Sequence, residues 1–216
     1  MNRELIAKAE AFLKETYDAS ARMQAHPAQR IYRLEHAYRV ANIAKTIAEE
    51  EGFNVTYAVL GALLHDISYC DEMPSREEWM AHGRRSAAMA RPFLESLGLP
   101  DVAVNDICYS IAIHVDDEAD FQWERSPFSE IVGDADNIDR IDAYRIYESL
   151  EYNKFSAMTL EEKQERVAST IQKMTDFKEL SLGSPTARKL WLRRVEYYLD
   201  FYEKLKAQLA YSNEIQ

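Results

Sequence analysis

The 216-residue sequence contains little of what turn-rich, disulfide-bonded or membrane-spanning proteins need. Gly and Pro occur only six times each, whereas all-β folds use many of both in their turns, so the composition favours helices. The two cysteines, Cys70 and Cys108, form no CxxC pair, which favours a reducing compartment over a disulfide framework. No run of 18 apolar residues occurs, and the charged N-terminus has no apolar signal-peptide core. We therefore expect a cytoplasmic protein that has no membrane partner.

Basic residues are also scarce. The 26 Lys and Arg residues are outnumbered by 37 Asp and Glu residues, which gives a net charge of −11. A nucleic acid polymer needs a basic stripe on its partner, so we expect no such partner here. A small anionic substrate remains compatible with this charge, because a bound metal can reverse the sign of the field locally.

Apolar residues recur at helical spacing along most of the chain. This pattern predicts helices at 3–20, 32–51, 54–67, 82–97 and 100–114, resumes over 128–153, and predicts two last helices at 159–175 and 185–212. The segments 68–80 and 115–126 are polar or acidic and are expected to be loops. No convincing strand pair or internal repeat is visible, so the sequence predicts a single all-α domain spanning residues 1–216.

Histidine and aspartate gather around these predicted helix ends. His65 and Asp66 end the apolar run AVLGALLHD, and imidazole with carboxylate suits a divalent ion such as Mn, Fe or Zn. The same two residues would also be compatible with a polar pair that caps the helix or faces solvent and binds no metal. His36 lies on the second predicted helix, and Asp136 follows an apolar lead-in in IVGDADNIDRID. Several acidic neighbours of Asp136 offer alternatives, namely Asp134, Asp139 and Asp142.

The order His36, His65-Asp66, Asp136 resembles the signature of the HD superfamily of metal-dependent phosphohydrolases. The segments EHAYRVANIA, GALLHDI and DADNIDRID resemble its first helix, its His-Asp segment and its last motif. Asn137 stands where that last motif usually has Arg, which weakens a phosphate role for this position. The resemblance covers about residues 30–145 and implies a helical HD-type bundle, followed by C-terminal helices at about 155–212.

The resemblance also implies a metal centre. Carried over residue by residue, it assigns one divalent ion to His36, His65, Asp66 and Asp136. His82 and His114 resemble the two additional histidines with which longer HD patterns often hold a second ion. Either one can instead contact the substrate or a ligand, or be exposed. The cofactor expected is one or two divalent ions of Mn, Fe, Mg, Ni, Co or Zn.

The chemistry implied is hydrolysis of a phosphate ester or phosphoanhydride in a small anionic substrate, by family analogy a nucleotide. A divalent ion neutralises phosphate charge and lowers the pKa of bound water. Asp66 is expected to bridge two ions or to orient the water, and His82 or His114 to transfer a proton. The substrate's remaining phosphate charge needs cationic side chains near the metal ligands. The candidates are Arg39, Arg84 and Arg140.

Two other functions stay open. The ligand order His, His-Asp, His, His, Asp also resembles diiron oxygenases of this fold, which cleave a C–C or C–P bond with O2. A non-enzymatic sensor that binds a nucleotide is the third hypothesis. Aromatic residues in the two predicted loops either stack on a substrate base or pack the loops down. These are Tyr69, Trp79, Phe121 and Trp123.

Overall fold

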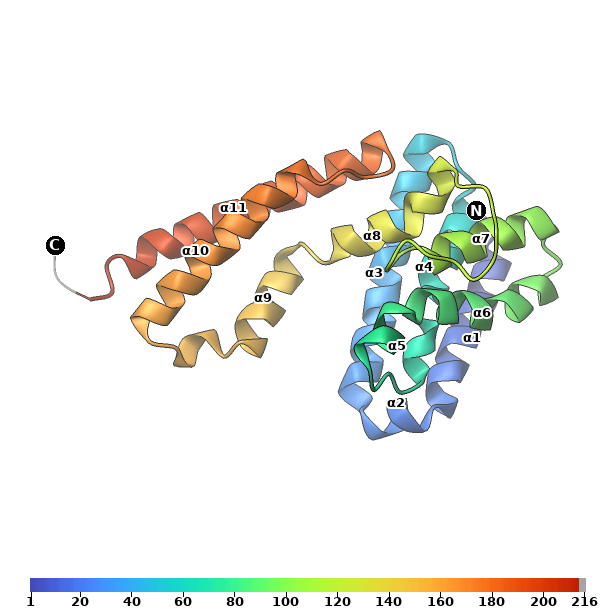
Figure 1. Cartoon of the computed structure of the whole chain (residues 1–216), viewed down its shortest axis with the longest axis horizontal. Coiled ribbons are helices and arrows are strands. Elements are labelled where there is room, and N and C mark those ends of the chain that lie inside the picture. Colours follow the sequence, from blue (N-terminus) through green and yellow to red (C-terminus); the bar gives the residue numbers. More distant parts are fainter. Residues whose placement is uncertain (214–216) are drawn as a thin grey trace. The chain divides into compact units, whose positions relative to one another are not determined.

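The computed structural model describes residues 1–213 and is all-α (Figure 1). Over these residues it contains eleven α-helices, four short 3₁₀ segments and no strand. The all-α prediction is therefore confirmed. No helix in this part of the chain is long and apolar enough to cross a membrane.

The chain divides into two compact units, Met1–Asn137 and Ile138–Gln216. The first unit contains the helices that carry the histidines. They are α1 (Arg3–Ala19), α2 (Ala21–Ala25), α3 (Pro27–Glu51), α4 (Val55–Leu64), α5 (Arg76–Met80), α6 (His82–Ser96), α7 (Asp101–Ala112) and most of α8 (Ile131–Asp139). The single domain expected over residues 1–216 stays a prediction, which a single cooperative unfolding transition would support.

Helix α4 is the centre of the first unit. It packs against α3, α1 and α7, and eight of its ten residues are buried. A helix that is apolar on all sides is stable only inside a core, which explains the near-continuous run VTYAVLGALL. Gly52 ends α3 in the left-handed conformation (φ 74°), and the Asn54 side chain then accepts hydrogen bonds from the backbone N–H groups of Thr56 and Tyr57. The core thus holds α4 in place, and its C-terminal end carries His65 and Asp66.

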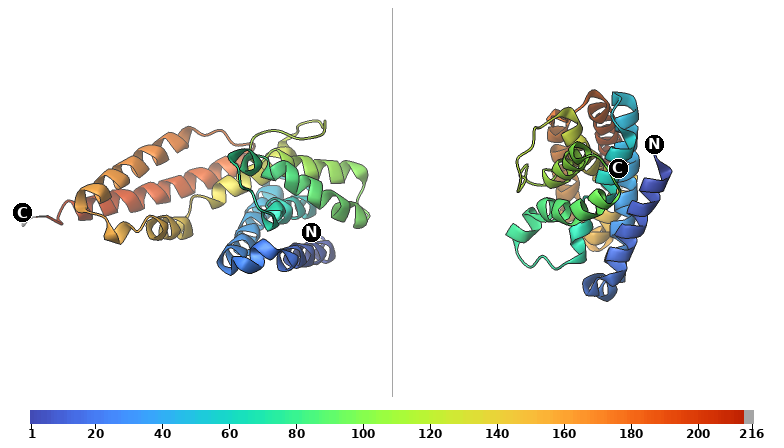
Figure 2. Two further views of the ribbon diagram at one scale, coloured as in Figure 1. Left: turned by 60° about the horizontal axis from the view of Figure 1, so that its bottom comes forward. Right: turned by 90° about the vertical axis from the view of Figure 1, so that its right-hand side faces the viewer.

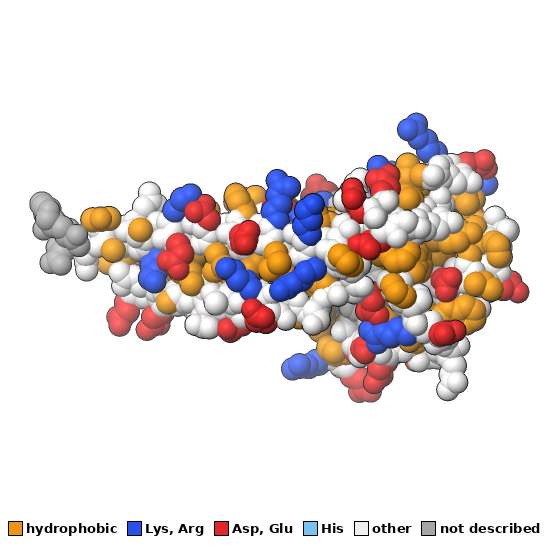
Figure 3. All heavy atoms as spheres, turned by 90° about the horizontal axis from the view of Figure 1, so that it is seen from above, with side chains coloured by type: hydrophobic (Ala, Val, Ile, Leu, Met, Phe, Trp, Pro, Cys, Tyr) orange, Lys and Arg blue, Asp and Glu red, His pale blue; other side chains and the backbone are white. Residues whose placement is uncertain are grey.

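The second unit contains α9 (Ala143–Tyr152), α10 (Leu160–Asp176) and α11 (Pro185–Leu209). Helices α10 and α11 lie side by side in opposite directions (Figures 1 and 2). Their ends are joined by the Trp191 indole, which donates a 2.7 Å hydrogen bond to the carbonyl of Phe177. Lys and Arg side chains alternate with Asp and Glu side chains along this unit in Figure 3. The sequence from 138 to 216 has 13 residues of each sign, whereas residues 1–137 have 24 acidic and 13 basic residues, so the net negative charge belongs to the first unit.

The helices depart from the sequence prediction at several places, since α2 was not predicted and α4 ends at Leu64 rather than at 67. Helix α3 begins at Pro27 rather than at 32, because proline suits the first turn of a helix. The predicted loop 68–80 contains a 3₁₀ segment at Ile67–Cys70 and the short helix α5, which starts with a capping box between Ser75 and Glu78. The apolar pattern over 128–153 is interrupted after α8, where the Asp142 side chain caps the start of α9.

Replacing the cap of α4 is expected to destabilise the first unit. Asn54→Ala removes the acceptor for two backbone N–H groups and should lower the free energy of unfolding by about 1 kcal/mol. Asn42→Ala is the matched control, since Asn42 is an exposed residue inside α3, where alanine has the better helix propensity. Urea denaturation followed by circular dichroism measures both variants. Equal stability of the two would contradict this role for Asn54.

Candidate metal centre

Three of the histidines lie where one helical segment ends. The last turn of a helix leaves carbonyl groups without partners inside the helix. His65 Nδ1 lies 2.7 Å from the carbonyl oxygen of Ala62, His82 Nδ1 lies 2.6 Å from that of Trp79, and His114 Nδ1 lies 2.6 Å from that of Ile111. In each case the acceptor is three residues earlier in the chain. Each carbonyl favours the tautomer that carries its proton on Nδ1, which leaves the Nε2 lone pair available to a metal.

His36 and Asp136 come from the middle of helices rather than from their ends. His36 is a buried residue of α3, and Asp136 belongs to α8. Their side chains meet, with His36 Nε2 3.1 Å from Asp136 Oδ1. His65 Nε2 lies 3.3 Å from His36 Nε2 and 4.0 Å from Asp136 Oδ1. The structure therefore brings Asp136, the residue that the family resemblance favours, together with these two histidines.

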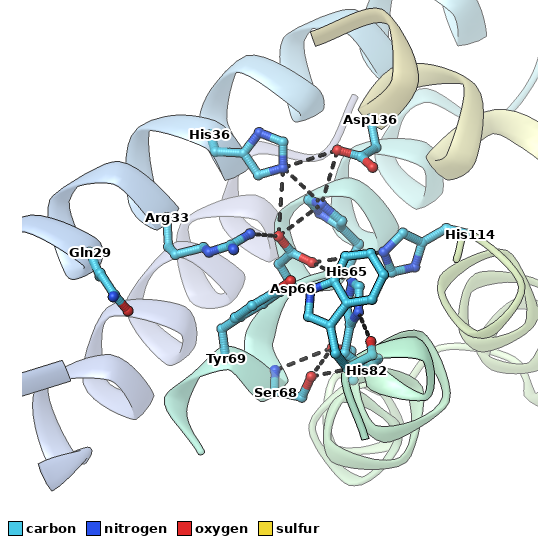
Figure 4. A network of polar contacts seen from close by, with 12 residues as sticks. Gln29, Arg33, His36, His65, Asp66, Ser68, Tyr69, His82, His114 and Asp136 are labelled. Atoms are coloured by element: carbon cyan, nitrogen blue, oxygen red, sulfur yellow. Dashed lines mark hydrogen bonds and ion pairs between the residues drawn. The ribbon is translucent and has the colours of Figure 1, made fainter. Parts of the chain in front are cut away.

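The Asp66 carboxylate lies between two groups of histidines (Figure 4). Its Oδ2 atom faces His36 Nε2 at 3.6 Å and His65 Nε2 at 3.5 Å. Its Oδ1 atom faces His82 Nε2 at 3.2 Å and His114 Nε2 at 3.7 Å. One carboxylate therefore presents a different oxygen to each pair of imidazoles, so Asp66 belongs to both possible ligand groups.

Arg33 is a part of this site that the sequence analysis missed. It lies on α3 one turn before His36, and its guanidinium donates a 2.6 Å hydrogen bond to Asp66 Oδ2. The guanidinium also stacks on the Tyr69 ring, 3.4 Å from its centroid. The sequence spacing could have indicated Arg33. A residue three positions before a ligand lies on the same face of the helix, and side chains lean towards the N-terminus of their helix.

The N-terminal helices hold the backbone that carries Asp66. The buried Tyr17 hydroxyl donates a 2.9 Å hydrogen bond to the Asp66 carbonyl. The Ser20 hydroxyl donates to the Cys70 carbonyl, and Arg22 donates a 2.6 Å bond to the Tyr69 carbonyl. Residues before position 30 lay outside the family resemblance, and nothing in their sequence pattern indicated these contacts.

The surroundings shift the pKa values of the buried groups in opposite directions. Burial lowers the pKa of His65 to about 4, so its imidazole is neutral near pH 7 and its Nε2 can bind a metal. Burial alone would raise the pKa of Asp66, but the neighbouring His65 imidazole and the charged guanidinium of Arg33 outweigh it and hold that pKa well below the usual range. A neutral imidazole beside an ionised carboxylate is the state that a divalent ion requires of its ligands.

The residues fit a divalent ion on two grounds. The donor set of imidazole nitrogens and carboxylate oxygens suits a first-row transition metal. In addition, His114 Nε2 is buried and has no hydrogen-bond partner among residues 1–213, although burying a polar atom without a partner costs free energy. Two ligand groups are possible, His36 with His65 and Asp66, and Asp66 with His82 and His114.

The arginines predicted from the sequence are placed differently from one another. Arg39 lies on α3 three residues after His36 and is partly buried. Arg84 forms ion pairs with three acidic residues of the 115–126 loop, Asp116, Glu118 and Asp120. Arg140 is exposed and belongs to the second unit. Arg84 is therefore already neutralised by the loop, whereas Arg33 takes the position beside the ligands.

Most aromatic residues of the two loops pack against protein. The Trp123 indole donates a 2.8 Å hydrogen bond to Asp106, and the Phe121 ring contacts the ring of Tyr109. These contacts hold the 115–126 loop against α7. Trp79 differs, since it is 40% exposed while its ring lies 5.7 Å from that of His82.

Comparison with known proteins agrees with this site. The HD domain family model matches residues 33–144. The chain belongs to the HD domain family. The matched segment includes every residue of the two ligand groups and ends after Asp136. A search among curated proteins found no match.

Solved structures share the fold across both units. A predicted HD superfamily hydrolase from an uncultured Thermotogales bacterium is 22% identical, with 95% of this chain and 91% of that chain covered and a TM-score of 0.62. Bacillus subtilis YpgQ in complex with ADP is 17% identical, with 95% of each chain covered and a TM-score of 0.61. A protein from Listeria innocua is 20% identical, with 97% and 98% covered and a TM-score of 0.61. At these identities the likeness concerns the fold.

Removing the metal is expected to destabilise this HD protein. Without a cation, Asp66 and Asp136 repel each other in a buried site, and any ion that binds only the folded state stabilises it. A strong chelator should therefore lower the melting temperature, and Mn²⁺ or Fe²⁺ should restore it. Asp66→Ala is the control, because its melting temperature should not respond to the chelator. An unchanged melting temperature, in protein that metal analysis showed to contain an ion beforehand, would contradict the metal centre.

Proposed function

We propose that this HD protein is a metal-dependent phosphohydrolase that cleaves a phosphate ester or phosphoanhydride bond with two divalent ions. The observation that carries the proposal is the position of Asp66, whose two carboxylate oxygens face different pairs of histidines. We assign one ion to His36, His65, Asp66 and Asp136, and the other to Asp66, His82 and His114. A shared carboxylate suits paired ions that act on one phosphoryl group.

The bound ions would neutralise phosphate charge and lower the pKa of a water molecule. The residues of this chain have separate tasks. Arg33 keeps the Asp66 carboxylate ionised and oriented through its 2.6 Å hydrogen bond. The helix-end carbonyls hold three imidazole rings with Nε2 directed towards Asp66. If only the first ion is bound, His82 or His114 is free to transfer a proton instead.

The proposed substrate is a small phosphate compound. The first unit carries the whole net negative charge of the chain, so an anion is attracted only where cations gather. The ligand cluster beside Arg33 would become such a place once it held its divalent ions. The nucleotide hypothesis draws support from one relative of the same fold, the Bacillus subtilis protein in complex with ADP. Trp79, exposed beside His82, offers a ring on which a base can stack.

A substrate screen separates this proposal from its two alternatives. Phosphate release from a nucleotide and phosphomonoester panel under anaerobic conditions with Mn²⁺ would support the phosphohydrolase. Turnover that requires O2, together with a mixed-valence iron signal, would identify the oxygenase, since the same six ligands suit both. Tight nucleotide binding without any turnover would identify the sensor.

Single substitutions of the ligands should each lower the occupancy of the ion that the substituted residue binds. Asp66→Ala removes the shared ligand and should abolish both ions and activity. His36→Ala should reduce chiefly the first ion, and His82→Ala chiefly the second. Inductively coupled plasma mass spectrometry and Mn²⁺ titration measure the stoichiometry. His26→Ala is the control and should change nothing, because His26 is exposed at the start of α3. Folded Asp66→Ala protein with full metal and full activity would refute the assignment.

The arginine substitutions should act chiefly on the substrate, and Arg33→Gln should also weaken metal binding because it removes a support of Asp66. Arg39→Gln should keep the ions and raise KM, because a guanidinium does not ligate cations but does bind phosphate. Arg33→Gln should lower kcat as well, since it also removes the hydrogen bond to Asp66. Arg3→Gln is the control, at an exposed position of α1. Steady-state kinetics would contradict these roles if all three variants matched the wild type.

A further inference from the structure

Gly83 follows His82 at the start of α6 and lies against the end of α7. A Cβ atom at this position would be only 2.6 Å from the carbonyl oxygen of Ala112. It would also be 3.0 Å from His114 Nδ1 and 3.0 Å from the carbonyl oxygen of Ile111. Real Cβ atoms essentially never approach backbone oxygen as closely as 2.6 Å, so any side chain here would force the two helices apart.

Two of these three neighbours, His114 Nδ1 and the Ile111 carbonyl oxygen, are the partners of one hydrogen bond. His114 Nδ1 and the Ile111 carbonyl lie 2.6 Å apart, and this contact orients the His114 ring. A side chain at position 83 would therefore crowd both partners of this hydrogen bond. The same close approach brings the His82 and His114 rings to 5.0 Å between centroids, where both face Asp66 Oδ1.

The other ligands of the site lie on other helices and are not neighbours of position 83. His36 and Asp136 come from α3 and α8, and His65 ends α4. None of their side chains is among the three nearest neighbours of a Cβ at position 83.

We propose that Gly83 is a positioning residue for the second metal ion: its missing side chain admits the hydrogen bond that aims His114 Nε2 at Asp66. The inference rests on the two-ion function proposed above. A side chain at position 83 should weaken the ion held by Asp66, His82 and His114 and leave the ion of His36, His65 and Asp136 in place. Removing the support of a metal-ligating histidine weakens metal binding by about 10- to 100-fold.

The chain contains a matched control. Gly133 also borders His114, but a Cβ there would lie 3.6 Å from His114 Cα, which is ordinary van der Waals contact. Gly133→Ala should therefore keep both ions at wild-type affinity, whereas Gly83→Ala should weaken the second ion by about 10- to 100-fold. Isothermal titration of the full chain with Mn²⁺ measures both affinities. Two unchanged affinities in folded Gly83→Ala protein would overturn the proposal.

Nuclear magnetic resonance tests the proposal without relying on the number of ions. In full-length protein with ¹⁵N-labelled histidine, with and without Zn²⁺, wild type and Gly133→Ala should show a His114 Nδ1 proton protected from exchange. Gly83→Ala should lose it, and a retained protected proton would overturn the proposal. Wild-type protein that binds a single ion would refute the two-ion function, while the fate of this proton would still decide the role of Gly83.

A double variant covers the case in which Gly83→Ala does not fold. Gly83→Ala/His114→Ala removes the ring that the added methyl group would meet. The contacts of the added methyl group with the Ala112 and Ile111 carbonyl oxygens remain in both backgrounds, so their cost cancels in the comparison. If Gly83 acts through His114, Gly83→Ala should lower the helical content and the melting temperature less in the His114→Ala background than in the wild-type background, because effects of residues that act through one another are not additive. An equal loss in both backgrounds would show that the glycine serves helix packing alone, and the proposal would fail.

Discussion

The Asp66 carboxylate is the group on which the rest of the site depends. It is buried, it is ionised, and each of its oxygens faces a different pair of imidazoles. An ionised carboxylate is stable inside a protein only where cations or hydrogen-bond donors surround it. Arg33 supplies one such donor, His82 Nε2 lies 3.2 Å from the other oxygen, and a divalent ion bound by the cluster would add the compensation of a full positive charge.

The surrounding fold keeps this carboxylate from moving. Helix α4 is buried on all sides, so the packing of three neighbouring helices determines where its last residues lie. Beyond its end, the hydroxyl of Tyr17 holds the Asp66 carbonyl, and Arg22 holds that of Tyr69. Metal ligands need such support, because a small displacement of a first ligand weakens binding strongly. The N-terminal helices therefore belong to the site, although the family match starts only at residue 33.

The same local hydrogen bond orients three of the four histidines at the site. Each follows the end of a helical segment and directs Nδ1 to a carbonyl three residues earlier. The helix ends thus satisfy their own unpaired carbonyls and at the same time select the tautomer with a free Nε2. At His114 this arrangement further requires that the neighbouring helix have no side chain at position 83.

The sequence by itself determined most of the helices and the set of metal-ligand candidates. Apolar periodicity is a local property, so α1, α6, α10 and α11 were predicted within a few residues. The end of one apolar run indicated His65 and Asp66, and the family resemblance added His82 and His114. Only the tertiary structure decided which cations serve the site, because that depends on which helix faces meet. Arg84 is paired with an acidic loop, and Arg33 rather than Arg39 donates to Asp66. The sharing of Asp66 between two ligand groups has the same origin, since no sequence spacing specifies which oxygen of a carboxylate faces which neighbouring helix.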